Sequence, residues 1–233
     1  MSCVNDLDDP KIKFLGVFID PFLTFKNHIA HINSKIATGL FFLRSARHIL
    51  NEKSLKYMYY SLVHCHLIYA IHIYSCSSEN LLKTLHLKQK NAIRIITNSK
   101  YNAHTEPLFK QLLILPFPQL CTFFKLQFMQ NFVQQFLPCS FDNTWITNRI
   151  RRDGQAEIEL RNDNNLYIPY ARNTTVSKFP LTAFPKLWEE FPADNIKFIR
   201  NKIEFNLELK NYFLSQLSFT PNCSRLLCPS CHL

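Results

Sequence analysis

The chain is organised around residues 13–29, KFLGVFIDPFLTFKNHI, where an apolar run with one glycine leads into a long amphipathic segment. Residues 14–19 are apolar on both alternating faces, and this pattern predicts a short strand that is buried on both sides. Asp20 and Pro21 end the run. A helix is predicted from Phe25 onward, with Thr24 as its N-cap. The sequence thus predicts a buried strand that passes directly into a helix.

Composition predicts a mainly α-helical protein. The 233 residues include 47% hydrophobic residues and 21 Phe but only 3 Gly, which favours helices over a turn-rich β fold. Lys and Arg outnumber Asp and Glu by 27 to 17, and the net charge of +10 indicates a polyanionic partner such as nucleic acid or an acidic membrane surface. The N-terminus shows no secretion signal, so we expect an intracellular protein, cytoplasmic or nuclear, with reduced cysteines.

Apolar residues recur at helical spacing in six segments: 25–49, 51–78, 80–97, 105–115, 119–137 and 194–214. Asn51 and Asp194 are the predicted N-caps of the second and the last of these helices. Residues 57–78 carry no Asp, Glu, Lys or Arg and are long enough to span a bilayer. Three histidines and four serines make them too polar for that, so we expect a buried core helix and no membrane partner.

The fifth helical segment is rich in phenylalanine, and the composition of the chain changes after it. Its five phenylalanines at helical spacing are interpreted as core packing rather than as a surface for stacking bases. In residues 138–191, Asn, Thr, Asp and Pro are spread among short apolar groups without a sustained period. This segment is therefore predicted to be rich in loops, with short strands around residues 156–160 and 166–170.

The helix predicted over residues 80–97 carries a basic stripe. Its apolar face is formed by Leu81, Leu85, Ala92 and Ile96, and the opposite face by Lys83, His86, Lys90 and Arg94. Two interpretations of the stripe stay open. It is either a solvated helix face or a row of contacts for phosphates, with no acidic neighbour inside the segment to neutralise it.

Motifs for catalysis are almost absent from the sequence. It contains no Gly-rich phosphate loop, no Gly-x-Ser-x-Gly elbow and no His-Glu-x-x-His helix. Adjacent carboxylates such as Asp6, Asp8 and Asp9 can hold paired magnesium ions in a nucleotidyl transferase. These three lie close to the N-terminus and next to a proline, so we interpret them as a solvated turn.

The C-terminal tail holds a set of zinc-type ligands, namely Cys223, Cys228, Cys231 and His232. Three thiolates with a fourth nitrogen or sulfur ligand are typical of a structural zinc site. However, His232 directly follows Cys231, and adjacent side chains in an extended chain point apart. Zinc binding and a reduced, flexible tail therefore both stay open.

Several segments, in the same order, resemble the C-terminal part of a reverse transcriptase from non-LTR, LINE-type retrotransposons of the jockey-like kind. KFLGVFID with PFLTFKNHI is similar to the passage from palm to thumb, and YYSLVHCHLIYAIHIYSC and LKQKNAIRIITNSKYNAHTEPLFKQLLIL resemble thumb helices. RNDNNLYIPYARNTT, FPKLWEEFP and CSRLLCPSCHL are similar to the terminal segments of these elements. Tyr74 departs from the family, which usually has Trp there.

The resemblance implies four parts: a palm-edge strand remnant (1–22), a helical thumb-like domain (23–137), a loop-rich linker (138–192) and a C-terminal helix with a Cys-rich tail (193–233). It further implies that Lys83, Lys90 and Arg94, with Lys88 beside them, grip an RNA or DNA template-primer duplex. The family's Asp-Asp hairpin, palm and fingers are missing, so we expect a chain that is inactive alone. Magnesium belongs only to the complete parent enzyme.

Two alternatives to a nucleic-acid-binding remnant stay open. The chain is either a structural helical protein whose basic excess merely makes the surface soluble, or a truncated gene model of an active reverse transcriptase. The coding sequence upstream of Met1 decides the second alternative. In a fragment without the palm, the apolar strand at the palm edge lacks a partner, and we expect it to favour self-association.

Overall fold

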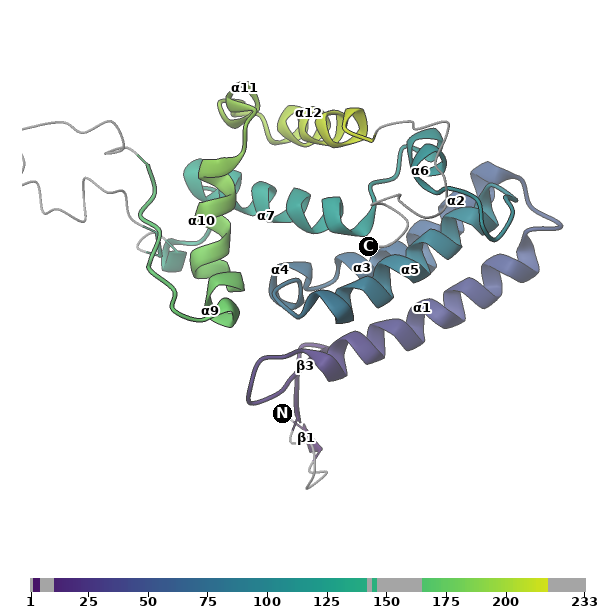
Figure 1. Cartoon of the computed structure of the whole chain (residues 1–233), viewed down its shortest axis with the longest axis horizontal. Coiled ribbons are helices and arrows are strands. Elements are labelled where there is room, and N and C mark those ends of the chain that lie inside the picture. Colours follow the sequence, from purple (N-terminus) through teal and green to yellow (C-terminus); the bar gives the residue numbers. More distant parts are fainter. Residues whose placement is uncertain (1, 5–10, 142–143, 146–164, 218–233) are drawn as a thin grey trace, which may run out of the picture. The chain divides into compact units, whose positions relative to one another are not determined.

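The computed structural model describes residues 2–4, 11–141, 144–145 and 165–217 (Figure 1). The fold is mainly helical, with a small sheet at the N-terminus and a final helix, which confirms the predicted fold class. The chain divides into two compact units. Unit 1 comprises residues 1–121 and 210–233, and unit 2 comprises residues 122–209. The divisions fall inside two helices rather than at the boundaries predicted from sequence.

The N-terminal sheet is antiparallel, with β1 (Ser2–Val4), β2 (Lys11–Phe14) and β3 (Val17–Ile19) in that order. The chain turns back between β2 and β3, because Leu15 and Gly16 both have positive φ, 45° and 82°. Two such residues are typical of the tight turn that joins hairpin strands. The predicted single buried strand is therefore wrong: Phe14 and Leu15 are exposed, and only Val17 of the run is buried.

Helix α1 (Lys26–Ala46) begins at a cap that sequence reasoning assigned to the wrong residue. Phe25, not Thr24, occupies the N-cap position, with φ of 55°. The carboxylate of Asp20 accepts hydrogen bonds from the backbone N–H groups of Thr24 (2.9 Å) and Phe25 (2.8 Å) and from the Thr24 hydroxyl (2.9 Å). The buried Asp20 thus satisfies backbone donors ahead of the helix.

The second predicted helix is interrupted. Asn51 caps α2 (Glu52–Tyr59) as predicted, since its Oδ1 accepts a 2.8 Å hydrogen bond from the N–H of Ser54. The helix continues through a π-helical turn, η1 (Tyr60–His64), into α3 (Cys65–Ile68). Ala70 has φ of 55°, which ends this helix before the short α4 (Ile71–Tyr74).

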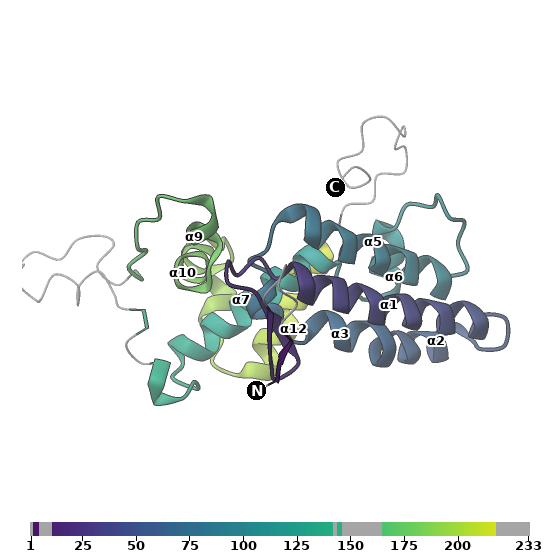
Figure 2. The ribbon, with the colours of Figure 1, turned by 90° about the horizontal axis from the view of Figure 1, so that it is seen from below.

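Unit 1 is completed by α5 (Glu79–Ile96), α6 (Glu106–Leu112) and the first residues of α7 (Phe117–Val133). Helix α1 packs along α5 and against η1 and α3, as Figures 1 and 2 show. The core between these helices contains fully buried aliphatic side chains, among them Ile36, Leu43, Val63, Leu85 and Ile93.

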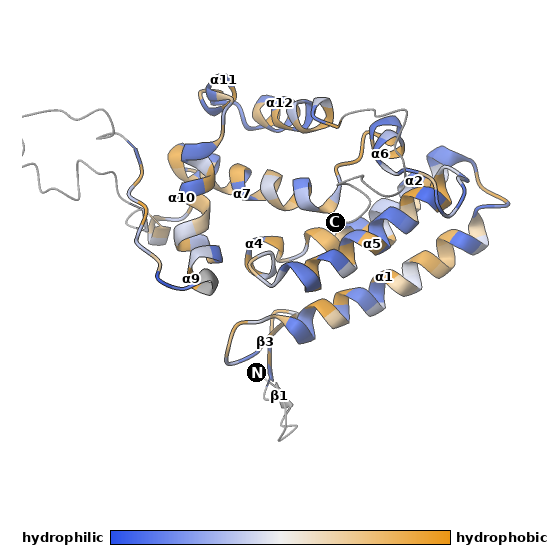
Figure 3. Cartoon of the chain, viewed as in Figure 1, coloured by the Kyte–Doolittle hydropathy of each residue, from blue (hydrophilic) through white to orange (hydrophobic). Residues whose placement is uncertain are grey.

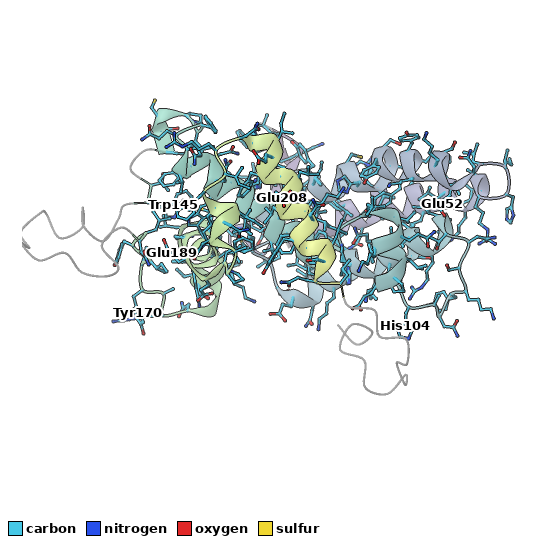
Figure 4. All side chains as sticks on the ribbon, turned by 90° about the horizontal axis from the view of Figure 1, so that it is seen from above. Glu52, His104, Trp145, Tyr170, Glu189 and Glu208 are labelled. Atoms are coloured by element: carbon cyan, nitrogen blue, oxygen red, sulfur yellow. The ribbon has the colours of Figure 1, made fainter. Side chains whose placement is uncertain are left out.

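Unit 2 is built around aromatic side chains. Phe128 of α7 contacts the rings of Phe141, Trp145 and Phe184, with centroids 5.7–6.1 Å apart. Trp145, labelled in Figure 4, also donates from Nε1 to the carbonyl of Leu181 at 2.9 Å. Phe128 packs against these rings but is itself only half-buried, and Phe136 at the end of the predicted stripe is exposed, so the core interpretation is wrong for Phe136.

The rest of unit 2 differs from the loops predicted for it. The short η2 (Cys139–Phe141) is followed by α9 (Thr174–Lys178) and α10 (Pro180–Glu190). Helix α10 was missed because it contains Pro185 and starts at a proline, Pro180. Leu166 forms an isolated bridge instead of a predicted strand, and residues 156–160 lie outside the described part.

The last predicted helix is two helices, α11 (Asp194–Lys197) and α12 (Lys202–Ser215). Asp194 is the first helical residue rather than the N-cap. In α12, Phe205 and Leu209 are buried, whereas Ile203 and Leu207 are exposed although their spacing is helical. Hydropathy along the helices is shown in Figure 3.

Among the described helices, none alone is long and apolar enough to cross a bilayer, and only the bent pair α6 and α7 meets the length and composition criteria.

Candidate nucleic-acid interface

The four basic residues predicted on α5 do not form one solvated stripe. Lys90 is buried, with 7% of its surface exposed, and so is His86 at 8%. Both interpretations of the stripe require exposed side chains, so neither holds for these two residues. The His86 ring stacks on Phe109 of α6, with centroids 6.4 Å apart, so this side of α5 is covered by α6.

Arg94 is held by the loop that follows α5. Its Nε donates a 3.0 Å hydrogen bond to the carbonyl of Ala103, and its guanidinium lies 6.0 Å from the centroid of the Tyr101 ring. These contacts give Arg94 a structural role in fixing the loop, which sequence patterning alone does not reveal.

Lys88 joins α5 to α1. Its Nζ donates to the carbonyl of Asn33, and the Asn33 side-chain amide donates to the Thr84 hydroxyl at 2.8 Å. Partial burial lowers the pKa of Lys88 from its ordinary value. Lys83 is half-buried and makes no hydrogen bond or ion pair with any described residue. Of the predicted four, Lys83 is thus the side chain with most freedom to meet a phosphate.

Positive charge is concentrated in unit 1. Its described residues, 2–4, 11–121 and 210–217, carry fifteen Lys and Arg against four Asp and Glu, an excess of eleven. The described residues of unit 2 carry seven against five. Two acidic residues of unit 2, Glu189 and Glu208, are labelled in Figure 4. The basic excess of the described chain therefore belongs almost entirely to unit 1.

Two of the four carboxylates in the described part of unit 1 have hydrogen-bond partners inside it. Asp20 is buried beneath the start of α1. Glu52, at the beginning of α2, accepts a 3.2 Å hydrogen bond from the Gln111 side chain (Figure 4). Neither residue belongs to α1. The exposed side of α1 therefore has no carboxylate of its own.

The outer face of α1 is the basic surface that sequence reasoning missed. We define it by the exposed side chains of Lys26, Lys35, Phe41, Phe42 and Arg44. Helical spacing puts Lys26 and Arg44 along one edge of the exposed side and Lys35 and Phe42 along the other, with Phe41 between them. Figure 2 shows this helix between α5 on one side and α3 on the other. The signal was available, because the 31 residues 21–51 contain no Asp or Glu. A surface with cations and no carboxylates attracts polyanions.

Metal binding finds no support in the described part of the chain. There, no group of three or more His, Cys, Asp or Glu side chains is placed to hold an ion. Burial, with a smaller effect from the charge of Lys210, lowers the pKa of His64 to about 4, so its ring is neutral at pH 7. The predicted zinc ligands Cys223, Cys228, Cys231 and His232 lie outside the described residues.

Comparison of the chain with protein-family models, with curated proteins and with solved structures found no match.

Proposed function

We propose that unit 1 binds nucleic acid through the phosphate backbone, without reading sequence, and that the outer face of α1 is the contact surface. The observation that carries the proposal is the excess of eleven positive charges in the described part of unit 1, next to a helix whose exposed side has no carboxylate. Each phosphate neutralised by a Lys or Arg releases counterions, so such binding is sensitive to salt.

The proposal revises which residues make the contact. Lys90 is buried, and Lys88 and Arg94 have partners within the protein. We therefore place the main contacts at Lys26, Lys35 and Arg44, and a further contact at Lys83 of α5. Contacts of this kind position a nucleic acid but do not specify its sequence. The resemblance to a LINE-type reverse transcriptase thumb supports the same role and implies no catalysis by this chain alone.

Charge reversal on α1 tests the proposal. We expect the double variant Lys35→Glu, Arg44→Glu to bind a fluorescently labelled duplex at least tenfold more weakly than the wild type in about 50 mM salt. Its matched control, Arg200→Glu, Lys202→Glu, changes the same net charge at exposed positions of unit 2 and should keep most of the affinity. Fluorescence anisotropy measures both.

The competing function is a purely structural helical protein. It is favoured by the internal roles of Lys88 and Arg94, which show that part of the basic excess stabilises the fold. This alternative predicts no binding by the wild type even at low salt, or equal losses in the two double variants.

A further inference from the structure

We infer that Phe41 and Phe42 form a stacking platform for unpaired bases, so that the nucleic acid held on α1 is single-stranded where it meets these rings. The inference rests on the proposed function of the same face. It adds the class of nucleic acid, which the charges alone do not define.

The two rings are not part of the core. Phe41 is 62% exposed and Phe42 is 49% exposed, whereas Ile36, Leu40 and Leu43 on the opposite side of α1 are buried. The buried side of the helix is thus complete without them. Two adjacent exposed phenylalanines expose apolar surface to water, which costs free energy unless a ligand covers it.

The geometry of the rings suits bases. Their centroids are 5.7 Å apart and their planes are inclined by 69°, an edge-to-face pair in which the edge of one ring meets one face of the other and the pair covers no further face. One helical turn away on the same helix, the side chains of Ala37, Thr38 and Ser45 are short. Any base can stack on an aromatic face, so the platform does not select a sequence.

Cations flank the platform. Arg44 lies three residues after Phe41, and Lys35 lies seven residues before Phe42, which places each cation within about two helical turns on a neighbouring line of the same helix. Proteins that bind single strands combine aromatic rings, on which bases stack, with cations that contact the phosphates. In a duplex the base faces are already stacked on each other and cannot reach the rings.

Charge argues against a protein as the occupant. A second copy of the chain docked on this face would bring Lys35 and Arg44 towards the same cations of its partner, with no carboxylate on either α1 to pair them. A polyanion removes that repulsion. We therefore assign the face to a single-stranded nucleic acid.

The test compares Phe41→Leu, Phe42→Leu with the wild type on a pyrimidine single strand and on a duplex of equal length, at one low salt concentration. Leucine keeps the surface apolar but removes the rings. We expect the single-strand affinity to fall about tenfold or more and the duplex affinity to stay within about twofold. Phe41→Trp should retain single-strand binding and show a fluorescence change that the wild type lacks.

Phe136→Leu, at an exposed position of unit 2, is the matched control and should leave both affinities unchanged. Equal single-strand affinity in the leucine variant and the wild type overturns the inference, and so does an equal loss on both substrates. A wild type that forms dimers, with the leucine variant monomeric in sedimentation, shows an interface between copies and also overturns it. Absence of all binding by the wild type rejects the proposed function itself, which distinguishes the two failures.

Discussion

Asp20 fixes where α1 begins, and its substitution should destabilise the start of this helix. Its carboxylate accepts three hydrogen bonds of 2.8–2.9 Å from Thr24 and Phe25. We expect Asp20→Ala to lower the free energy of unfolding by about 2 kcal/mol, because two buried or half-buried backbone donors lose their acceptor. Urea denaturation at pH 7 measures it. Asp194→Ala, which removes an exposed carboxylate, should cost less than about 1 kcal/mol.

Protonation of the same carboxylate should make the fold less stable at low pH. Burial acts to raise the pKa of Asp20, but the hydrogen bonds from Thr24 and Phe25 together outweigh it, so the pKa is lowered from 3.8. The stabilisation by Asp20 is therefore complete above pH 3.8 and is lost as the pH falls through the lower folded-state pKa. Asp20→Asn should remove this part of the acid dependence in denaturation curves recorded between pH 5 and pH 2. An unchanged dependence contradicts the assignment.

Buried histidines make the stability of the fold depend on pH in a second range, which lies above that of Asp20. Burial lowers the pKa of His28, His64 and His86 from 6.5 to about 4, and neither ring nitrogen of His28 has a hydrogen-bond partner among the described residues. Below pH 6.5 the unfolded chain binds protons that the folded chain does not, so stability falls from pH 6.5 towards pH 4, by up to about 1.4 kcal/mol per pH unit for each histidine.

His28→Leu tests this at one site. We expect the free energy of unfolding to fall less steeply between pH 7 and pH 5 in this variant than in the wild type, because one group that takes up a proton only on unfolding is gone. A slope in the His28 variant equal to that of the wild type would show that the ring is accessible to protons in the folded state.

At the scale of elements, α1 and η1 approach each other closely at Gly39. A Cβ added to Gly39 would lie 2.7 Å from the carbonyl oxygen of Leu62, in the π-helical turn. Helix propensity alone favours alanine by about 1 kcal/mol, but the clash with backbone cannot be relieved by a side-chain rotation. We expect Gly39→Ala to destabilise the protein by about 1–3 kcal/mol in thermal or urea unfolding.

Ala37→Gly is the matched control for that substitution. It lies two residues away on the exposed side of α1 and should cost about 1 kcal/mol from propensity alone. A Gly39→Ala variant that is more stable than the wild type would show that the two elements can move apart.

Gln89 connects three elements in the core of unit 1. Its Nε2 donates to the Tyr59 hydroxyl (2.9 Å) and to the Leu115 carbonyl (3.0 Å), and its Oε1 accepts from the N–H of Phe117 (2.7 Å). Gln89→Leu leaves these buried groups without their partner, and we expect a loss of about 3 kcal/mol. The half-buried Asn91→Leu on the same helix is the control, with an expected change below about 0.5 kcal/mol.

Elements that depend on local chemistry were predictable, and those that depend on distant partners were not. The cap at Asn51 involves residues three apart, so the sequence shows it. The turn at Leu15 and Gly16 carries leucine where Asn or Gly is usual, so the hairpin was hidden. The internal roles of Lys88 and Arg94 arise only when α1 and the loop at Ala103 fold against α5, which no spacing along the helix reveals.

At the scale of the whole molecule, the distribution of charge is more informative than its total. The net charge of +10 indicates a polyanionic partner without saying where it binds. Among the described residues, the excess of positive charge lies in unit 1. The exposed side of α1 is the surface that we assign to it. Such a unit should bind nucleic acids of any sequence with similar affinity.

The salt dependence of binding tests this account most directly. With contacts at Lys26, Lys35, Arg44 and Lys83, a plot of log Kobs against log salt for a single strand should have a slope of about −3, and the variant Lys35→Glu, Arg44→Glu should be shallower by more than 1. No binding by the wild type at about 50 mM salt, or a slope that the variant does not change, contradicts the assignment of the outer face of α1 as the nucleic-acid interface.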